Sequence, residues 1–134
     1  MEDRCSFEVE MTSNTGMVLE FIAAWSRRDL TEIMSYLSPD CVYHNIPFAP
    51  VAGRAEIKAI IGPLLARSSE VEWIVRQIGT SPIGAVLTER LDRFKIADKW
   101  VEIPVMGTFE LVDNRIVAWR DYFDAAQFQA QMPV

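Results

Sequence analysis

Hydrophobic residues recur at two different spacings along the chain, and the spacing changes near residue 70. Before that point, three apolar stripes repeat every three to four residues, which is typical of helices that bury one face. Capping residues and a Pro-Asp turn divide this region into segments. Helices are predicted over residues 16–28, 29–37 and 55–66.

Beyond residue 70, apolar and polar residues alternate, which predicts strands. Asp113 and Asn114 have the composition of a tight hairpin turn, and Ser38-Pro39-Asp40 that of a turn before a first short strand. Asp124 is well placed to cap a short terminal helix over 123–132. Helices followed by antiparallel strands indicate an α+β domain with the helices on one face of a curved sheet. The strands are predicted over 41–45, 71–78, 85–94, 100–111 and 115–121.

Length and composition exclude several classes of protein. The 134 residues fit one domain, which we assign to 14–134, after a polar segment 1–13 that is predicted to be a flexible tail. The net charge of −6 argues against nucleic-acid binding, which needs a clustered positive field. No apolar run is long enough for a membrane span, and the N-terminus lacks the apolar core of a secretory signal.

Two distant cysteines and one histidine limit the available chemistry. Cys5 and Cys41 are expected to be free thiols, which suits a cytoplasmic protein. A zinc site needs close cysteine pairs or several histidines, so neither a metal nor another cofactor is expected. Acid and base chemistry in this chain is therefore predicted to rest on carboxylates.

The predicted strand 85–94 carries two charges on a face that is otherwise apolar. Side chains alternate along a strand, so Arg90 and Asp92 point the same way, beside Val86 and Phe94. Taken alone, this pattern also fits a solvated ion pair, which would contribute at most about 1 kcal/mol.

Asp121 follows a strand with a large apolar face and has Tyr122 and Phe123 after it. It could cap the terminal helix, but Asp124 is better placed to do so, which leaves Asp121 without a structural role. If Asp121 and Asp92 lie close together, both cannot ionise cheaply, and one keeps its proton near neutral pH.

Tyr43 and Asn45 share one face of the first predicted strand, whereas His44 points the other way. A hydroxyl and an amide together supply the donors and acceptors that hold a water molecule. Hydrogen bonding at a strand edge would explain the same pair. His44 is interpreted as a structural residue.

Taken together, these residues resemble the limonene-1,2-epoxide hydrolase family. The resemblance covers most of the chain. It rests on V-L-E-F in the first helix, Y-x-N before Ile46-Pro47, Gly53-Arg54, T-E-R-x-D at 88–92 and W-R-D-Y-F-D at 119–124. It implies a cone-shaped fold similar to that of nuclear transport factor 2, with a mixed, mostly antiparallel sheet, N-terminal helices packed on it and a short C-terminal helix.

The resemblance also implies roles for single residues. Asp121 matches the family's general base, Asp92 its general acid and Arg90 the bridge between them. Tyr43 and Asn45 match the residues that hold the attacking water with Asp121. Trp73 and Trp100 are expected in the core or an interface. The family's apolar substrate pocket maps to Ile22, Trp25, Leu64, Ile103, Val105, Phe123 and Phe128.

The implied function is hydrolysis of a hydrophobic, terpene- or cycloalkene-type epoxide to a vicinal trans-diol, by one-step attack of water. Its partners would be the epoxide, water and a second copy of the chain. The homodimer is expected because Leu87 and Leu91 place apolar side chains on the outer sheet face. Two alternatives stay open: a ligand-binding module of the same fold, and an isomerase or cyclase that uses one aspartate base.

Overall fold

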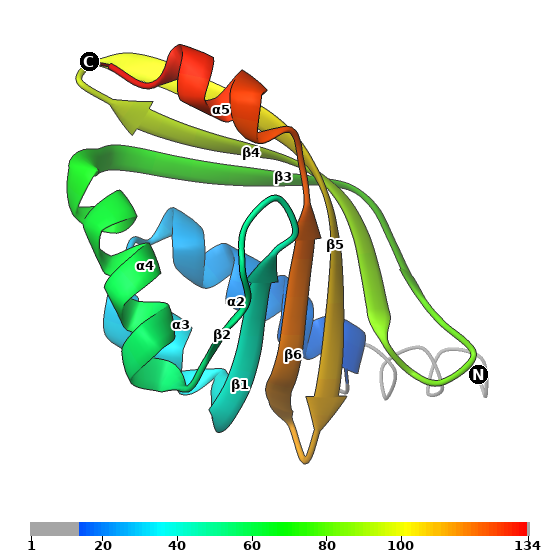
Figure 1. Cartoon of the computed structure of the whole chain (residues 1–134). Helices are drawn as coiled ribbons and strands as arrows, with labels where there is room; N and C mark the ends of the chain where they lie inside the picture. Colours follow the sequence, from blue (N-terminus) through cyan, green and yellow to red (C-terminus); the bar gives the residue numbers. More distant parts are fainter. Residues whose placement is uncertain (1–13, 134) are drawn as a thin grey trace.

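The computed structural model describes residues 14–133, so the tail predicted over 1–13 lies outside the described residues. The architecture is the predicted α+β arrangement (Figure 1). The elements in chain order are α2 (Asn14–Ser26), α3 (Leu30–Ser35), β1 (Leu37–Asn45), β2 (Val51–Ala52), α4 (Arg54–Arg67), β3 (Ser68–Thr80), β4 (Val86–Ile96), β5 (Lys99–Val112), β6 (Arg115–Tyr122) and α5 (Ala125–Gln131).

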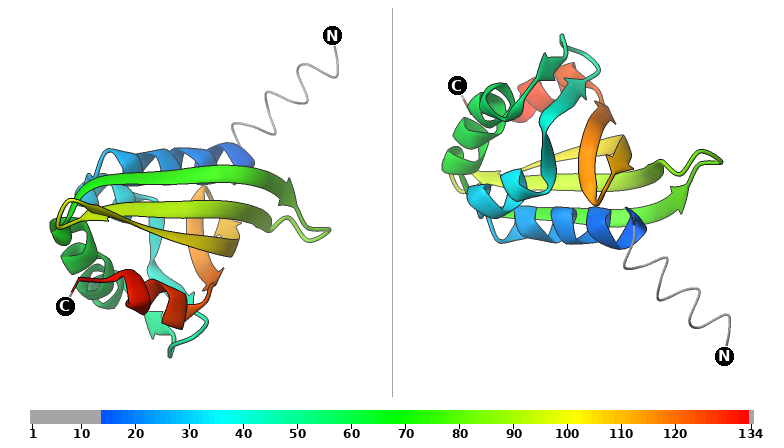
Figure 2. Two further views of the ribbon diagram at one scale, coloured as in Figure 1. Left: turned by 90° about the horizontal axis from the view of Figure 1, so that it is seen from above. Right: turned by 90° about the horizontal axis from the view of Figure 1, so that it is seen from below.

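One mixed sheet of six strands forms the body of the molecule, in the order β2-β1-β6-β5-β4-β3. Strands β3 to β6 form an antiparallel meander, and β1 joins its end by pairing in parallel with β6. The sheet is curled, and α2, α3 and α4 lie within its curve (Figure 2). This arrangement confirms the predicted fold class.

The inner face of the sheet closes on α2 through aromatic side chains. Phe21 of α2 meets Trp119 edge to face with ring centroids 5.1 Å apart, and Trp25 stacks on Trp73 at 4.3 Å. Aromatic pairs in these geometries add to the free energy gained by burying their area. The predicted stripe on α2 therefore anchors the helix to β3 and β6.

Strand β4 has the faces that alternation predicts. Val86, Thr88, Arg90, Asp92 and Phe94 are buried, whereas the residues between them are exposed or half-buried. Both neighbouring strands pair with β4 along its length, which fixes its register. The sequence pattern therefore correctly places Arg90 and Asp92 on the inner face.

Two of the predicted local signals have the expected geometry. Asp113 and Asn114 both have positive φ angles, of 51° and 63°, as a two-residue hairpin turn of this type requires. Asp124 caps α5 by accepting a hydrogen bond from the Gln127 backbone at 3.1 Å. The helix begins after this cap, at Ala125, so Phe123 lies before the helix and not within it.

The turn predicted at Ser38-Pro39-Asp40 is wrong, because these residues belong to β1. The second helix ends at Ser35, which also puts Leu37 in the strand. The pairing of β1 with β6 shifts register between Leu37 and Val42, so the proline lies where the ladder is interrupted. A proline that cannot donate to a ladder is tolerated at such a bulge. The two-residue strand β2 was not predicted.

The outer face of the sheet combines ion pairs with an apolar patch. Arg93 of β4 pairs with both Glu72 of β3 and Glu102 of β5, its direct cross-strand neighbours. Beside this cluster lies what we call the outer patch: Ile74, Leu87, Leu91, Pro104, Met106 and Tyr122. None of the helices within residues 14–133 has the length and apolar character needed to cross a membrane.

Candidate active site

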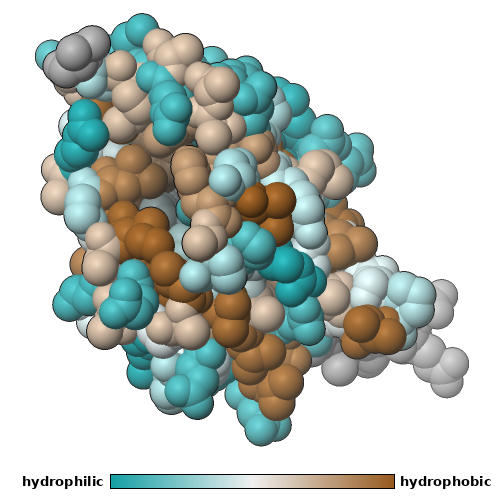
Figure 3. Space-filling model, viewed as in Figure 1, coloured by the Kyte–Doolittle hydropathy of each residue, from teal (hydrophilic) through white to brown (hydrophobic). Residues whose placement is uncertain are grey.

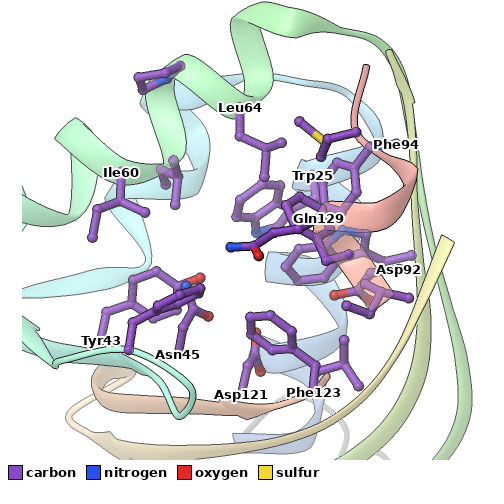
Figure 4. A pocket seen from close by; sticks show the side chains of 18 of the residues that line it. Trp25, Tyr43, Asn45, Ile60, Leu64, Asp92, Phe94, Asp121, Phe123 and Gln129 are labelled. Atoms are coloured by element: carbon purple, nitrogen blue, oxygen red, sulfur yellow. The ribbon is translucent and has the colours of Figure 1, made fainter. Parts of the chain in front are cut away.

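A cavity of about 540 Å³ lies between α4, α5 and the inner face of the sheet. Its size falls within the usual range for small-molecule sites. Brown apolar side chains gather where the surface is hollowed between α4 and the strands (Figure 3). Tyr43, Asn45 and Asp121 lie on one side of the cavity, and Trp25 and Leu64 face them (Figure 4). The cavity is therefore apolar with a group of polar residues at one end.

Arg90 joins the two aspartates at that end. Its Nε and Nη2 atoms donate to Oδ1 and Oδ2 of Asp92 at 3.0 and 2.9 Å, which makes a bidentate pair. Nη2 also donates to Asp121 Oδ2 at 3.1 Å. All three side chains are buried, and Arg90 lies behind the aspartates and does not line the cavity. The three charges form one buried cluster, which we call the Arg90 cluster.

Sheet register brings these residues together from distant parts of the chain. Asn45 on β1 lies beside Asp121 on β6, Asp121 beside Gly107 on β5, and Gly107 beside Thr88 on β4. Arg90 is two residues beyond Thr88 on the same face of β4. One row of cross-strand neighbours therefore carries the candidate base and a candidate water ligand.

Asp121 has one carboxylate oxygen that is satisfied and one that is not. Oδ2 accepts from Arg90, whereas Oδ1 is buried and has no hydrogen-bond partner within residues 14–133. Buried polar atoms are almost always paired, often with an ordered water. Oδ1 is therefore an unsatisfied acceptor, on the part of the carboxylate that lies against Gly107.

Burial controls the charge states of the cluster. Loss of solvent raises the pKa of Asp92 to about 6, because the charge of Asp121 adds to the effect of burial and Arg90 only partly opposes both. Burial alone would lower the pKa of Arg90, but the two carboxylates outweigh it and raise that pKa above its ordinary value. Asp92 is thus able to carry a proton near neutral pH while Arg90 stays charged.

Tyr43 is held by stacking on Trp119, with ring centroids 4.0 Å apart and planes 26° from parallel. Burial, followed by the charge of Asp121, raises the pKa of Tyr43 above its ordinary value. The phenol therefore keeps its proton and can donate a hydrogen bond. His44, on the other face of β1, contacts the Phe48 carbonyl oxygen through Nε2 at 2.9 Å.

The structure brings most of the predicted site residues to this cavity. Tyr43, Asn45, Asp92 and Asp121 line it, together with six of the seven residues predicted for the apolar pocket. Ile22 does not line it, because this residue packs into the core one turn before Trp25 on α2, and the larger Trp25 reaches the cavity. The six are Trp25, Leu64, Ile103, Val105, Phe123 and Phe128.

Several lining residues were missed. Trp73 belongs to the buried core, as expected, but it also lines the cavity and lies under the guanidinium of Arg90, whose Cζ is 4.6 Å from the ring centroid. The register Trp73–Asp92 places it there, and a single strand pattern does not contain that register. The other missed residues include Phe48, Ile60, Phe94, Gln129 and Met132. Within residues 14–133, no group of three His, Cys, Asp or Glu residues has an arrangement that could hold a metal ion.

Comparison with known proteins agrees with the sequence resemblance. Residues 12–133 match the sequence model of the limonene-1,2-epoxide hydrolase catalytic domain. Epoxide hydrolase EphG of Mycobacterium tuberculosis is 35% identical over 104 residues, which cover 78% of this chain and 68% of that protein.

Solved structures give the same result for the fold. An LEH-like epoxide hydrolase of M. tuberculosis has a TM-score of 0.74 and 32% identity, over 86% of this chain and 85% of the other. A putative isomerase of Bacillus subtilis has a TM-score of 0.79 over 91% and 94% of the chains, but at 17% identity it shows the fold alone. On the family match and the 35% identical relative, this chain belongs to the limonene-1,2-epoxide hydrolase family.

Proposed function

We propose that the protein hydrolyses a hydrophobic epoxide to a vicinal trans-diol by direct, acid/base-assisted attack of water. The observation that carries this proposal is the Arg90 cluster at the polar end of an apolar cavity. Opening an epoxide with water needs a base for the water and an acid for the leaving oxygen. Two carboxylates in different environments supply both without a histidine.

Asp121 is the proposed base, with Tyr43 and Asn45 as the other ligands of the attacking water. The position of Asp121 supports this role, because its side chain lines the cavity, with Asn45 on the neighbouring strand. Arg90 compensates the charge of Asp121 through the ion pair with Oδ2. Holding the water in this position converts a bimolecular step into one within the complex.

Asp92 is the proposed acid. A pKa raised by burial allows its carboxyl group to be protonated near neutral pH. A carboxyl group has about four lone-pair positions, and the bidentate Arg90 pair occupies two, so a proton can lie on the side that lines the cavity.

The proposed reaction takes place in one step. A bond forms between the water oxygen and one epoxide carbon while the bond from that carbon to the epoxide oxygen breaks. Asp121 takes a proton from the water, and Asp92 gives its proton to the leaving oxygen. The diol leaves with Asp121 protonated and Asp92 ionised, and proton exchange with solvent restores the starting state.

An isomerase of the same fold would need one base and donors for an oxyanion, and a binding module would need neither carboxylate. A second buried acid and an arginine shared between the two therefore favour hydrolysis. The first experiment is a panel of cyclic and terpene epoxides with detection of the diol. Diol formation is expected. If no epoxide is hydrolysed and a ketone or rearranged product forms, the hydrolase proposal is wrong.

Oxygen labelling distinguishes direct attack by water from an ester intermediate on Asp121. With enzyme in excess in ¹⁸O-water, a single turnover is expected to give labelled diol and unlabelled Asp121. An unlabelled diol in the first turnover would mean that the oxygen came from a carboxylate. The proposed chemistry also uses no metal, so exhaustive chelation should leave the rate unchanged.

A homodimer through the outer patch is part of this proposal. Met106 and Tyr122 are about half exposed and pair across β5 and β6. Met106 lies opposite Glu89 on β4, and Leu87 and Leu91 flank Glu89 on the same face. Exposed apolar patches of this kind are typical of interfaces. Light scattering should give the mass of a dimer for the full chain and of a monomer for Met106→Glu. A monomeric wild-type protein at tens of micromolar, the order at which weak dimers associate, would contradict the proposal.

A further inference from the structure

Gly107 lies at the crowded centre of the Arg90 cluster, although it carries no side chain. On β5 it has Thr88 as its neighbour on one side and Asp121 on the other. A Cβ atom added to Gly107 would lie 2.5 Å from Asp121 Oδ1 and 3.1 Å from Thr88 Oγ1, and closer still to Arg90 Nη1. Distances below 3.0 Å are not found for real Cβ atoms, so one of these groups would have to move.

We propose that Gly107 is a positioning residue for the reaction: the space left by its missing side chain is where the Arg90 guanidinium reaches across β5 to Asp121. This inference rests on the proposed function, and it adds the requirement that residue 107 has no side chain. It concerns volume and not backbone conformation, because the φ angle of Gly107 is not positive.

The groups around the guanidinium leave it little freedom to yield. Nε and Nη2 are held by Asp92, Nη2 by Asp121, and Nη1 donates to Thr88 Oγ1 at 3.1 Å. Thr88 in turn donates to the Gly107 carbonyl oxygen at 3.1 Å, which ties it to the same position of β5. The ring of Trp73 covers one face of the guanidinium.

A methyl group at residue 107 would therefore separate Arg90 from Asp121 or turn the Asp121 carboxylate. Either change moves the base relative to the acid, and a displacement of about 1 Å at a reacting group can cost about 100-fold in rate. Gly107 does not line the cavity, so the apolar surface that binds the substrate stays in place. The loss should therefore appear in kcat and not in KM.

The chain offers a matched control in Gly79 on β3. It is also a strand glycine without a positive φ angle, but a Cβ atom added there meets nothing within 4 Å. Alanine is the better strand residue by roughly 0.5–1 kcal/mol, so Gly79→Ala should keep both stability and activity. Any general effect of replacing a strand glycine should appear in both variants.

The experiment compares Gly107→Ala and Gly79→Ala with the wild type on an epoxide that the panel identifies. Gly107→Ala is expected to lower kcat by about 100-fold, with KM within about twofold of the wild type. Gly79→Ala is expected to match the wild type in both constants. A Gly107→Ala protein with kcat within threefold of the wild type would overturn the proposal. So would a change confined to KM.

A second readout does not depend on activity. In ¹⁵N-labelled protein, the Nε–H signal of Arg90, assigned by its loss in Arg90→Lys, should shift or broaden in Gly107→Ala and stay unchanged in Gly79→Ala. An unchanged signal in Gly107→Ala would overturn the positioning role. If the wild type hydrolyses no epoxide, the proposed function fails, and this signal still tests the placement of Arg90.

A variant that does not fold is also informative. Lysine at residue 90 is slimmer at its end than arginine and removes the clash with Nη1. It also removes the Nη2 hydrogen bond that holds the Asp121 carboxylate, so Oδ1 can turn away from the added methyl group. If Gly107→Ala does not fold, the double variant Arg90→Lys/Gly107→Ala should fold, because the added methyl group then has space. If neither folds while Arg90→Lys alone does, the cost lies in the strand and not in the Arg90 contact, and the proposal is wrong.

Discussion

Strand β4 carries one arginine on each face, and each arginine contacts two carboxylates and one tryptophan. Arg90 points inward, pairs with Asp92 and Asp121, and lies over Trp73. Arg93 points outward, pairs with Glu72 and Glu102, and lies over Trp100 with its Cζ 4.1 Å from the ring centroid. We call this second group the Arg93 cluster.

The two clusters differ in exposure. The Arg90 side chain is fully buried, and its two carboxylates are 5% and 6% exposed. In the Arg93 cluster the arginine is 23% exposed and the carboxylates 53% and 45%. Water screens the outer charges, so they act as an ordinary surface network. Without that screening, burial and the neighbouring charges raise the pKa of Asp92 and of Arg90, and the same set of residue types becomes suited to acid and base chemistry.

The largest difference is expected in activity. Asp121→Asn replaces the proposed base with an amide of the same shape that cannot take a proton from water. We expect kcat/KM for epoxide hydrolysis to fall by about 10²–10⁴-fold, as is usual for loss of a general base. Glu72→Gln makes the same change in the Arg93 cluster and should leave the rate unaltered. Equal effects of the two variants would show that burial does not distinguish the clusters functionally.

Removal of each arginine tests the clusters by stability. Arg90→Met leaves two aspartates buried without their cation, which should lower the free energy of unfolding by about 3–5 kcal/mol at neutral pH. In Arg93→Met, water solvates the carboxylates of Glu72 and Glu102, so the free energy of unfolding should fall by less than about 1 kcal/mol. Urea unfolding of both variants gives the comparison. An Arg90→Met protein as stable as Arg93→Met would contradict the assigned burial.

The pH dependence should come from the inner cluster. In the folded protein the pKa of Asp92 is raised from 3.8 to about 6, so between these values the folded state binds more protons at Asp92 than the unfolded state does. This contribution to stability is therefore full below about pH 4 and is lost as the pH rises to about 6. Arg90 and Tyr43 stay protonated throughout this window.

The same proton serves the reaction, so kcat/KM should decline as the pH rises above about 6. Stability and rate profiles of the wild type and Asp92→Asn test both statements. Asp92→Asn should lose this part of the stability profile, and Arg93→Met should keep the rate profile of the wild type. A rate that rises steadily above pH 6 would exclude Asp92 as the acid.

Salt should give the smallest difference. The effect of Glu72→Gln on the free energy of unfolding is below about 1 kcal/mol and should shrink further in 1 M NaCl, where charges are screened over about 3 Å. The cost of Arg90→Met should persist at this salt concentration, because ions do not reach the buried carboxylates. Unfolding at low and high salt measures both. A salt-sensitive Arg90→Met effect would mean that the inner cluster is hydrated.

Local patterns predicted one strand of the site well and left the other parts undetermined. Alternation alone places Arg90 and Asp92 on the buried face of β4, because the side chains of a strand point to its two faces in turn, whatever the strand pairs with. Which residues then meet them depends on strand register, which distant pairing decides. Trp73 on β3 and Gly107 on β5 lie beside Arg90 because both strands pair with β4, so neither residue could be found from the sequence of its own segment.

The first strand also shows that local sequence does not determine strand pairing. Ser38-Pro39-Asp40 has the composition of a turn, but pairing with β6 extends β1 through these residues. Tertiary pairing here outweighs local preference, and the irregular register absorbs the proline. Alternation alone identified Tyr43 and Asn45 as a pair that could hold a water molecule, but hydrogen bonding at a strand edge explained the pair as well, and the family resemblance favoured the first interpretation.

The parallel pairing of β1 with β6 also bears on the order in which the protein folds. The meander from β3 to β6 closes through successive hairpins, and it alone brings Arg90, Asp92 and Asp121 together. Tyr43 and Asn45 reach the same place only when β1 pairs with β6, which is far from it in the sequence. Closing this long loop has a higher entropic cost than closing a hairpin. We therefore expect folding to assemble the acid and base first and the water ligands last, with low φ-values for β1 in the transition state.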